Sequence, residues 1–222
     1  GDIDGVAKEK WKLIASLPKE GCAILNKDDP RVAAMAKTTK AKIVWYGSAS
    51  NCDVRGHNIK ITEDYKTRFV LANKGQEVEV ELPILGEHFV SLSLAAASVG
   101  LINGMSLEDI KTGLEQFTPP PHRMVPIELP DGKVIIDDTY NANPLAVKAA
   151  IDLITKISPN KNKILVLGDM KELGAYEEKG HREVGKYAYE KGISKIIGLG
   201  NAVKFTLVEA VRLGLPKRDS IL

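Results

Sequence analysis

Ten residues limit most strongly what this chain can fold into: Ile135-Ile136-Asp137-Asp138-Thr139-Tyr140-Asn141-Ala142-Asn143-Pro144. An apolar run ends there in two acids. After a short polar loop, Asn143 and Pro144 form the pair typical of a helix start, an N-cap residue followed by proline at the first helical position. Apolar residues then recur at helical spacing from Val147 to Ile154. The stretch therefore predicts a strand, a loop and a helix in succession.

A unit of this kind can carry chemistry. Open α/β sheets bind ligands at the carboxyl ends of their strands, and the free N–H groups of a helix N-terminus attract phosphates and other anions. The plainer interpretation is a loop in which Asp137 or Asp138 only caps or turns the chain. The residues alone leave both interpretations open.

Strands and helices alternate after the proline-rich segment Thr118–Pro121, which we interpret as a linker. A hairpin over 125–136 comes first. A helix over 145–157, a strand over 163–167, a helix over about 178–191, a strand over 195–199 and a helix to about 213 follow. This alternation predicts a parallel sheet with crossover helices. Residues 121–222 are therefore expected to form a Rossmann-like, doubly wound α/β domain.

Residues 1–120 predict a different arrangement, a mixed sheet with helices. The pattern indicates a helix over about 4–17 and short buried strands over 22–26 and 42–46. Apolar and polar residues alternate from 53 to 85, which is typical of an antiparallel meander. An Ala-rich helix over 92–102 follows, and Ser106 begins another helix with Asp109 at its third position.

Composition excludes several classes of function. The chain has 222 residues, of which 44% are hydrophobic and 27% charged, with a net charge of +2. These values are typical of a globular protein and give no electrostatic case for nucleic acid. No apolar run reaches the length of a membrane span. Two cysteines, Cys22 and Cys52, are too few for a disulfide scaffold and fit a reducing cytoplasm.

Lys10 is the first candidate for chemistry outside the ten-residue stretch. On a helical wheel it shares the apolar arc of Val6, Leu13 and Ile14, where a lysine is unusual. Burial there would lower the pKa of its amine, and the neutral amine is the form that reacts with CO2 to give a carbamate. The alternative is a lysine that reaches the surface along its alkyl stem.

Three further patterns are weaker. His181 lies in an amphipathic stretch, and we interpret it as a structural histidine near a helix start. The residues Gly198-Leu199-Gly200 follow a predicted strand but lack the third glycine of a dinucleotide-binding fingerprint. No phosphate-binding P-loop occurs in the chain, because Gly180–Tyr187 has tyrosine where that motif needs serine or threonine.

The segment Asp137–Pro144 resembles the signature of the Mur ligases that add D-alanyl-D-alanine to UDP-N-acetylmuramoyl-tripeptide, an intermediate of peptidoglycan synthesis. Further segments resemble the same family in order along nearly the whole chain. They are Asn26-Lys27-Asp28-Asp29-Pro30, Gly86-Glu87-His88, Pro121-His122-Arg123-Met124, Leu167–Gly174 and His181–Gly185.

The resemblance implies an ATP-dependent ligase that works through an acyl phosphate. Residues 1–120 would be the end of its central ATP-binding domain, and 121–222 its C-terminal domain, incomplete at the end. Lys10, as a carbamate, would hold Mg2+, with Lys8 as the alternative, and Arg123 would clamp ATP phosphates. Four residues of the signature would also contact ATP or its neighbourhood: Asp138, Tyr140, Asn141 and Asn143. The resemblance also implies a cytoplasmic monomer.

The chain departs from the family pattern in two ways. Phe89 and Leu92 stand where relatives carry two asparagines that hold adenine, which leaves the recognition of the base open. The chain also begins at Gly1 without methionine and lacks the family's P-loop, so we interpret it as a piece of a longer ligase, inactive alone. Two alternatives remain: another ligase of the superfamily, such as a folylpolyglutamate synthase, or a non-catalytic relative that binds a nucleotide or a partner.

Overall fold

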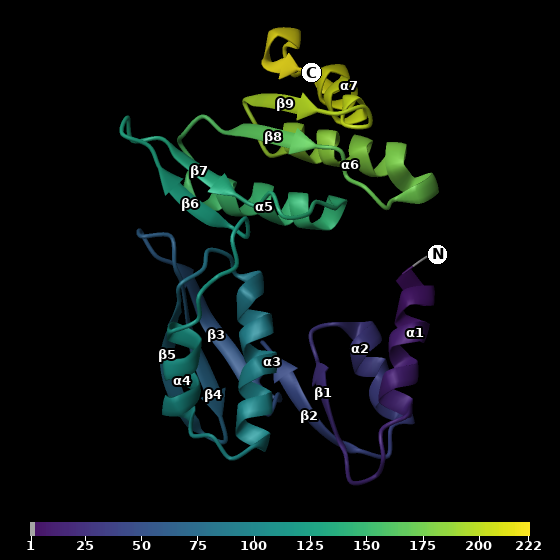
Figure 1. The fold of residues 1–222 in the computed structure, drawn as a ribbon, viewed down its shortest axis with the longest axis vertical. Helices are drawn as coiled ribbons and strands as arrows, with labels where there is room; N and C mark the ends of the chain where they lie inside the picture. Colours follow the sequence, from purple (N-terminus) through teal and green to yellow (C-terminus); the bar gives the residue numbers. More distant parts are fainter. Residues whose placement is uncertain (1–2) are drawn as a thin grey trace. The chain divides into compact units, whose positions relative to one another are not determined.

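A computed structural model describes residues 3–222 (Figure 1). Contacts divide the chain into two compact units, one ending at Asp137 and the other spanning Asp138–Leu222. Each unit has its own cluster of buried apolar side chains. Within residues 3–222, no helix combines the length and apolar character needed to cross a membrane.

The first unit is built on a five-stranded mixed sheet in the order β1-β2-β3-β4-β5. Its first part contains α1 (Ile3–Ala15), β1 (Cys22–Asn26), α2 (Pro30–Met35), the 3-10 turn η1 (Ala36–Thr38) and β2 (Lys42–Gly47). The meander consists of β3 (Val54–Ile61), β4 (Thr67–Asn73) and β5 (Gln76–Leu82). Strands β1, β2 and β3 pair in parallel, whereas β3, β4 and β5 pair antiparallel. The predicted meander is therefore confirmed.

Two helices complete the core of the first unit, α3 (His88–Ile102) and α4 (Leu107–Glu115). Their apolar side chains pack with alternate residues of the meander, among them Phe69, Leu71 and Val80. The predicted helix start at Ser106 is confirmed, because its side chain and that of Asp109 form a reciprocal capping box. The Ala-rich helix begins four residues earlier than predicted, at His88 rather than at residue 92.

A hairpin follows the proline-rich segment, with β6 (Val125–Glu128) paired antiparallel to β7 (Val134–Asp137). Gly132 at its turn has φ of 77°, a left-handed conformation that glycine adopts without strain. The hairpin groups by contacts with the first unit, whereas the sequence places a domain boundary at residues 120–121. That boundary stays a prediction.

The second unit carries the predicted alternation of helices and strands. Its elements are α5 (Pro144–Ile157), β8 (Ile164–Gly168), η2 (Gly174–Tyr176), α6 (Glu177–Glu190), β9 (Lys195–Leu199), α7 (Lys204–Leu213), η3 (Lys217–Asp219) and β10 (Ser220–Ile221). The sheet order is β10-β9-β8, and both pairings are parallel (Figure 1). The α/β class predicted from the sequence is therefore confirmed.

One apolar cluster forms the core of the second unit. Helices α5, α6 and α7 all contribute to it, together with Leu165 and Leu167 of β8 and Ile196 of β9. Ile164 and Val166 point to the other face of β8 and are exposed. The carboxyl ends of β8 and β9 lie side by side, since Gly168 pairs with Leu199.

Candidate functional site

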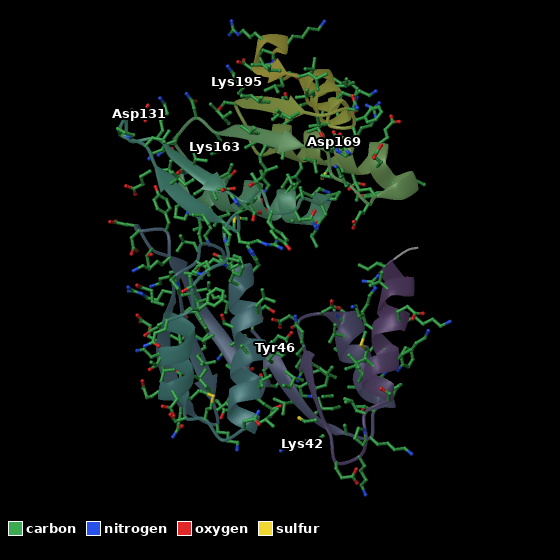
Figure 2. All side chains as sticks on the ribbon, viewed as in Figure 1. Lys42, Tyr46, Asp131, Lys163, Asp169 and Lys195 are labelled. Carbon is green, nitrogen blue, oxygen red and sulfur yellow. The ribbon has the colours of Figure 1, made fainter. Side chains whose placement is uncertain are left out.

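Polar side chains gather at the carboxyl ends of β1 and β2 in the first unit. Asn26 ends β1, Tyr46 lies on β2, and Ser91 lies in the first turn of α3 (Figure 2 labels Tyr46). The Asn26 amide donates to the Ser91 hydroxyl at 3.4 Å. Burial raises the pKa of Tyr46, while its hydrogen bond to Ser91 acts in the opposite direction. This edge is where a sheet with parallel strands holds ligands.

The two acids that follow β1 have structural roles. Asp29 caps α2, because its carboxylate accepts the N–H groups of Arg31 at 2.8 Å and Val32 at 3.2 Å. Asp28 accepts the Ser48 N–H at 2.8 Å and the Ser48 hydroxyl at 3.1 Å. Together they fix the loops after β1 and β2.

Phe89 and Leu92 occupy different surroundings at the start of α3. The Phe89 ring is half-buried against the core of the first unit, which agrees with the packing role that its apolar character suggests. Leu92 is 62% exposed. An apolar side chain on the surface offers no hydrogen bond to a base, so Leu92 cannot replace an adenine-binding asparagine.

Lys10 is exposed, which agrees with the alternative in which the lysine reaches the surface along its alkyl stem. Helix α1 packs against α2 and η1 through its flank, with Asp4 paired to Arg31 at 2.7 Å and the Trp11 indole donating to Thr38. No residue of α1 is buried. A helical wheel shows which arc is apolar but not whether another element covers that arc.

Arg123 is half-buried and lies between two residues of left-handed backbone. His122 has φ of 61° and Met124 has φ of 48°. The His122 Nδ1 lies 2.8 Å from a carboxylate oxygen of Asp137, and Met124 is buried. The backbone that carries Arg123 is thus held on both sides, which favours a defined position for its guanidinium.

The signature loop of the second unit has a structural component. Asn143 caps α5, because its side-chain oxygen accepts the Ala146 N–H at 2.9 Å. The Asn141 side-chain oxygen accepts the Ala142 N–H at 2.9 Å. Tyr140 is 66% exposed, and Asp138 is half-buried. The predicted N-cap is confirmed, and each asparagine retains its amide NH2 for a ligand.

The loop after β8 lies against the start of α5. A Cβ atom added at Gly180 of α6 would lie 3.0 Å from Pro144 and 3.2 Å from Leu173. Asp169 directs its carboxylate toward the start of α7. His181 is fully buried with both ring nitrogens hydrogen-bonded, as expected for a structural histidine. Two sequence motifs that lie about 30 residues apart therefore converge at one edge.

A charged pair links helices α5 and α6. Lys148 of α5 lies 3.0 Å from Glu183 of α6. The pKa of Glu183 is lowered, first by a hydrogen bond from Tyr176 and also by Lys148, against the opposing effect of burial. The sequence shows no signal for this link, because the partners are far apart along the chain.

The magnesium role that the resemblance implies for Lys10 stays a prediction. Across residues 3–222, no group of three or more His, Cys, Asp and Glu side chains is placed to hold a metal ion. Lys10, even as a carbamate, would be a single ligand group. Oxygen-rich sets are what Mg2+ requires.

Comparison with known proteins defines the class of this chain. Residues 1–100 match the family described as Mur ligase middle domain, and residues 122–218 match the Mur ligase, glutamate ligase domain. The two matches define a ligase chain with a middle and a C-terminal α/β domain. The chain therefore belongs to the Mur ligase family.

Individual relatives carry one name. The chain is 35% identical over 202 residues to the UDP-N-acetylmuramoyl-tripeptide--D-alanyl-D-alanine ligase of Escherichia coli K12, covering 90% of this chain and 44% of that protein. It is 34% identical over 205 residues to the ligase of the same name from Mycobacterium tuberculosis H37Rv, covering 90% and 40%. The chain thus spans less than half the length of these relatives.

Solved structures agree on the fold. A crystal structure of MurF from Acinetobacter baumannii superposes with a TM-score of 0.80 at 30% identity, covering 93% of this chain and 44% of that chain. MurF of Thermotoga maritima, solved in complex with ADP, superposes with a TM-score of 0.77 at 20% identity, covering 91% and 46%. The latter likeness supports the fold alone.

Proposed function

We propose that this chain is part of a ligase that adds D-alanyl-D-alanine to UDP-N-acetylmuramoyl-tripeptide. The observation that carries the proposal is the 35% identity over 90% of the chain to a ligase of that name. The placement of the signature loop supports it. That loop joins β7 to α5, and the start of α5 lies against the loop after β8.

The proposed reaction forms one amide bond at the expense of ATP. The γ-phosphoryl group passes to the terminal carboxylate of the tripeptide, and ADP leaves. The amine of D-alanyl-D-alanine then attacks the acyl carbon to give a tetrahedral intermediate. The carbon–oxygen bond to phosphate breaks, inorganic phosphate leaves, and the amine releases a proton to solvent. Holding both reactants in place and neutralising phosphate charge lower the barrier.

Arg123 is the residue that we propose for the phosphate. A guanidinium offers a planar fork of N–H donors that fits two phosphate oxygens at once. The left-handed residues His122 and Met124 on either side support a fixed course of the backbone there. Asp138 would help to position ATP.

The signature loop would meet nucleotide and substrate through a limited set of atoms. Because the oxygens of Asn141 and Asn143 accept backbone N–H groups, their amide NH2 groups are the donors that a ligand would use. Tyr140 offers an exposed ring and hydroxyl. These donors fit acceptor oxygens, such as those of phosphate or carboxylate.

Nucleotide binding belongs to the same proposal. The polar edge of Asn26, Tyr46 and Ser91 offers donors and acceptors to an adenine nucleotide, and a relative of the same fold is described as a complex with ADP. Lys10, as a carbamate, would give Mg2+ an oxygen ligand, and waters and ATP phosphates are the ligands that Mg2+ ordinarily adds. A cytoplasmic monomer is part of the proposal, and Cys22 and Cys52 are both free thiols.

A chimera tests the proposal. The 202-residue segment of the Escherichia coli relative that aligns with this chain would be replaced by the chain. We expect ADP release that requires UDP-N-acetylmuramoyl-tripeptide and D-alanyl-D-alanine, with little release when D-alanine, L-lysine or L-glutamate replaces the dipeptide. Arg123→Ala should lower kcat/KM by about 100-fold, as loss of a donor to developing charge typically does.

Three outcomes would contradict it. Turnover by the 222-residue chain alone would contradict the proposal that the chain is part of the ligase. Preference of the chimera for another amino acid would favour a different ligase of the superfamily. A chimera that folds and stays inactive, together with ATP binding by the chain in a thermal shift assay, would favour a non-catalytic nucleotide-binding relative.

A further inference from the structure

The loops after β8 and β9 touch through one carboxylate. Strands β8 and β9 run in parallel register, so Asp169 after β8 lies beside Gly200 after β9. Figure 2 labels Asp169 at the end of β8. A loop that leads from a parallel strand into a helix start is the place where dinucleotide-binding folds hold a diphosphate.

Three consecutive backbone N–H groups donate to the Asp169 carboxylate. Oδ1 accepts from Ala202 and from Val203, each at 2.8 Å, and Oδ2 accepts from Asn201 at 3.0 Å. Successive N–H groups of this kind form a concave site for an anion. Here the anion comes from the chain itself.

Gly200 makes this approach possible. Its φ is +128°, and a Cβ atom added there would overlap the Asp169 carboxylate. The glycine that made Gly198-Leu199-Gly200 resemble a phosphate loop therefore admits a side chain of the same protein. Burial acts to raise the pKa of Asp169, but the three backbone donors outweigh it and hold the pKa below its usual range. The carboxylate is charged at neutral pH.

The next residue of the loop is held from the opposite side. The Met170 N–H donates to Nε2 of His181 at 3.1 Å, and His181 Nδ1 donates to the Glu177 carbonyl at 2.8 Å. His181 is 0% exposed, and its own carbonyl accepts from the Thr206 hydroxyl at 3.0 Å. Since Nε2 accepts a hydrogen bond and Nδ1 donates one, the ring is the neutral Nδ1–H tautomer.

We propose that Asp169 is a built-in anion that occupies the backbone anion site at the start of α7, and that it thereby positions the loop Met170–Leu173 beside the start of α5. The loop after β9 then takes no phosphate, because its N–H groups are already paired. A phosphate bound at this edge is therefore held by groups other than these three N–H donors. Asp169 is a positioning residue and does not touch the ligand.

The experiment uses the 222-residue chain and its Asp169→Ala variant. Melting temperatures are compared in inorganic phosphate, acetate and chloride at one ionic strength and neutral pH. Phosphate raises the melting temperature of folded proteins in general and is also the anion proposed for Arg123, so the native chain gives the reference response to each salt. Asp169→Ala should melt lower in chloride and recover most of the loss in phosphate or acetate, since an external anion can occupy the vacated N–H groups.

Two variants serve as controls. Asp169→Asn keeps an accepting oxygen but not the charge, so it should melt between the other two and respond little to phosphate. Asp152→Ala removes a carboxylate of the same unit that pairs with Lys191 and Tyr187. Its response to phosphate and acetate should equal that of the native chain. A lowered melting temperature of Asp169→Ala with the same response to phosphate as Asp152→Ala would overturn the proposal.

A second measurement needs no variant. The amide protons of Asn201, Ala202 and Val203 are followed by NMR as the native chain is acidified. They should shift together, with a midpoint below the ordinary aspartate value of 3.8. Chemical shifts that stay constant as the pH falls would contradict the proposal, and so would a midpoint at the ordinary value. This holds even where Asp169→Ala fails to fold.

Discussion

The imidazole of His122 lies 2.8 Å from a carboxylate oxygen of Asp137, so the segment after the prolines is tied to the last residue of β7. His122 adopts this position with a left-handed backbone, φ of 61°. Its side chain is 58% exposed, and the pair therefore contributes modestly to stability. The left-handed backbone of His122 destabilises the folded state by more than this exposed pair stabilises it.

Replacement of His122 by glycine and by alanine should separate the two effects. Both variants lose the contact with Asp137, but only glycine adopts positive φ freely. We expect His122→Gly to be more stable than His122→Ala by about 0.5–1 kcal/mol, after the extra chain entropy of unfolded glycine is deducted. Urea unfolding measures this. His57 of β3, whose side chain pairs with Glu77 of β5, is the control, where glycine should be the less stable variant.

His181→Ala should destabilise the second unit strongly. The change removes a fully buried ring and leaves the Met170 N–H without its acceptor. Cavity formation and an unsatisfied buried donor together cost about 3 kcal/mol or more. The free energy of unfolding in urea checks this, with His57→Ala as the comparison at a side chain that is 18% exposed. A loss below about 1 kcal/mol would contradict the structural role of His181.

Local signals in the sequence predicted most of the fold. Local contacts form the caps at Ser106 and Asn143 and the turn at Gly132. A sequence pattern of a few residues is therefore enough to predict them. Helix α2 was not predicted, although Asp29-Pro30 repeats the N-cap and proline signal of Asn143-Pro144. Its six residues are too few to show helical periodicity.

The candidate site was less predictable, because its contacts join distant residues. Asp169 meets N–H groups more than 30 positions away, and His122 meets Asp137 across a hairpin. No rule based on sequence spacing predicts contacts between residues so far apart. Lys10 shows the same limit, since an apolar arc predicts which face of α1 could be buried and not that it is.

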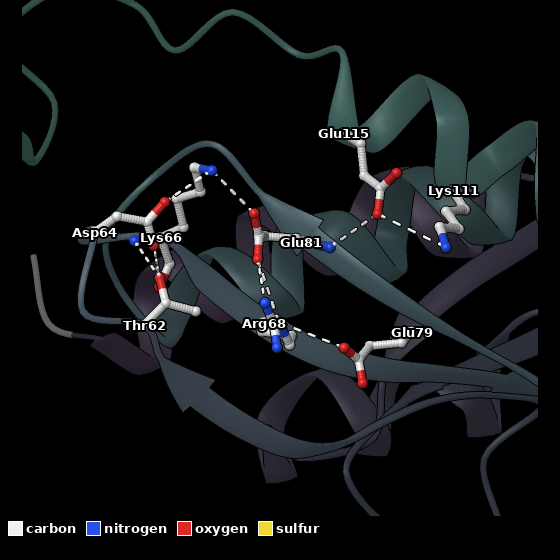
Figure 3. A network of polar contacts seen from close by, with 8 residues as sticks. All are labelled: Thr62, Asp64, Lys66, Arg68, Glu79, Glu81, Lys111 and Glu115. Carbon is white, nitrogen blue, oxygen red and sulfur yellow. Dashed lines mark hydrogen bonds and ion pairs between the residues drawn. The ribbon is translucent and has the colours of Figure 1, made fainter.

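Acid should weaken the first unit through a network of charges on β4, β5 and the turn before β4 (Figure 3). Asp64 and Glu81 both pair with Lys66, at 2.8 Å and 3.0 Å, and Glu81 also pairs with Arg68 at 2.6 Å. The hydrogen bond from Lys66 is the main cause that lowers the pKa of Asp64 from 3.8 to about 2. Hydrogen bonds from Arg68 and Lys66 lower the pKa of Glu81.

The sign of the effect follows from proton uptake. Both carboxylates bind protons less readily in the folded state, so their contribution to stability is present above the unfolded values and is lost as pH falls from about 4 toward 2. Urea unfolding gives the free energy of unfolding at each pH in this range. That free energy should fall less steeply with falling pH in Glu81→Gln than in the native chain. Glu63→Gln, which removes an acid beside the network, should leave the slope nearly unchanged. Equal slopes in all three proteins would exclude the network as the cause.

Two glycines in helices should respond in opposite directions to alanine. Gly185 lies where α6 approaches α7, and a Cβ atom there would overlap the backbone carbonyl of Thr206. Gly113 lies in α4, where a Cβ atom meets nothing within 4 Å. Alanine favours a helix interior over glycine by about 1 kcal/mol, so Gly113→Ala should gain roughly that amount. Gly185→Ala has the same gain in propensity but must separate two packed helices, and overpacking of this kind costs about 1–3 kcal/mol or more. We therefore expect Gly113→Ala to unfold at higher urea and Gly185→Ala at lower urea than the native chain, and a stabilised Gly185→Ala would show that α6 and α7 are not packed this closely.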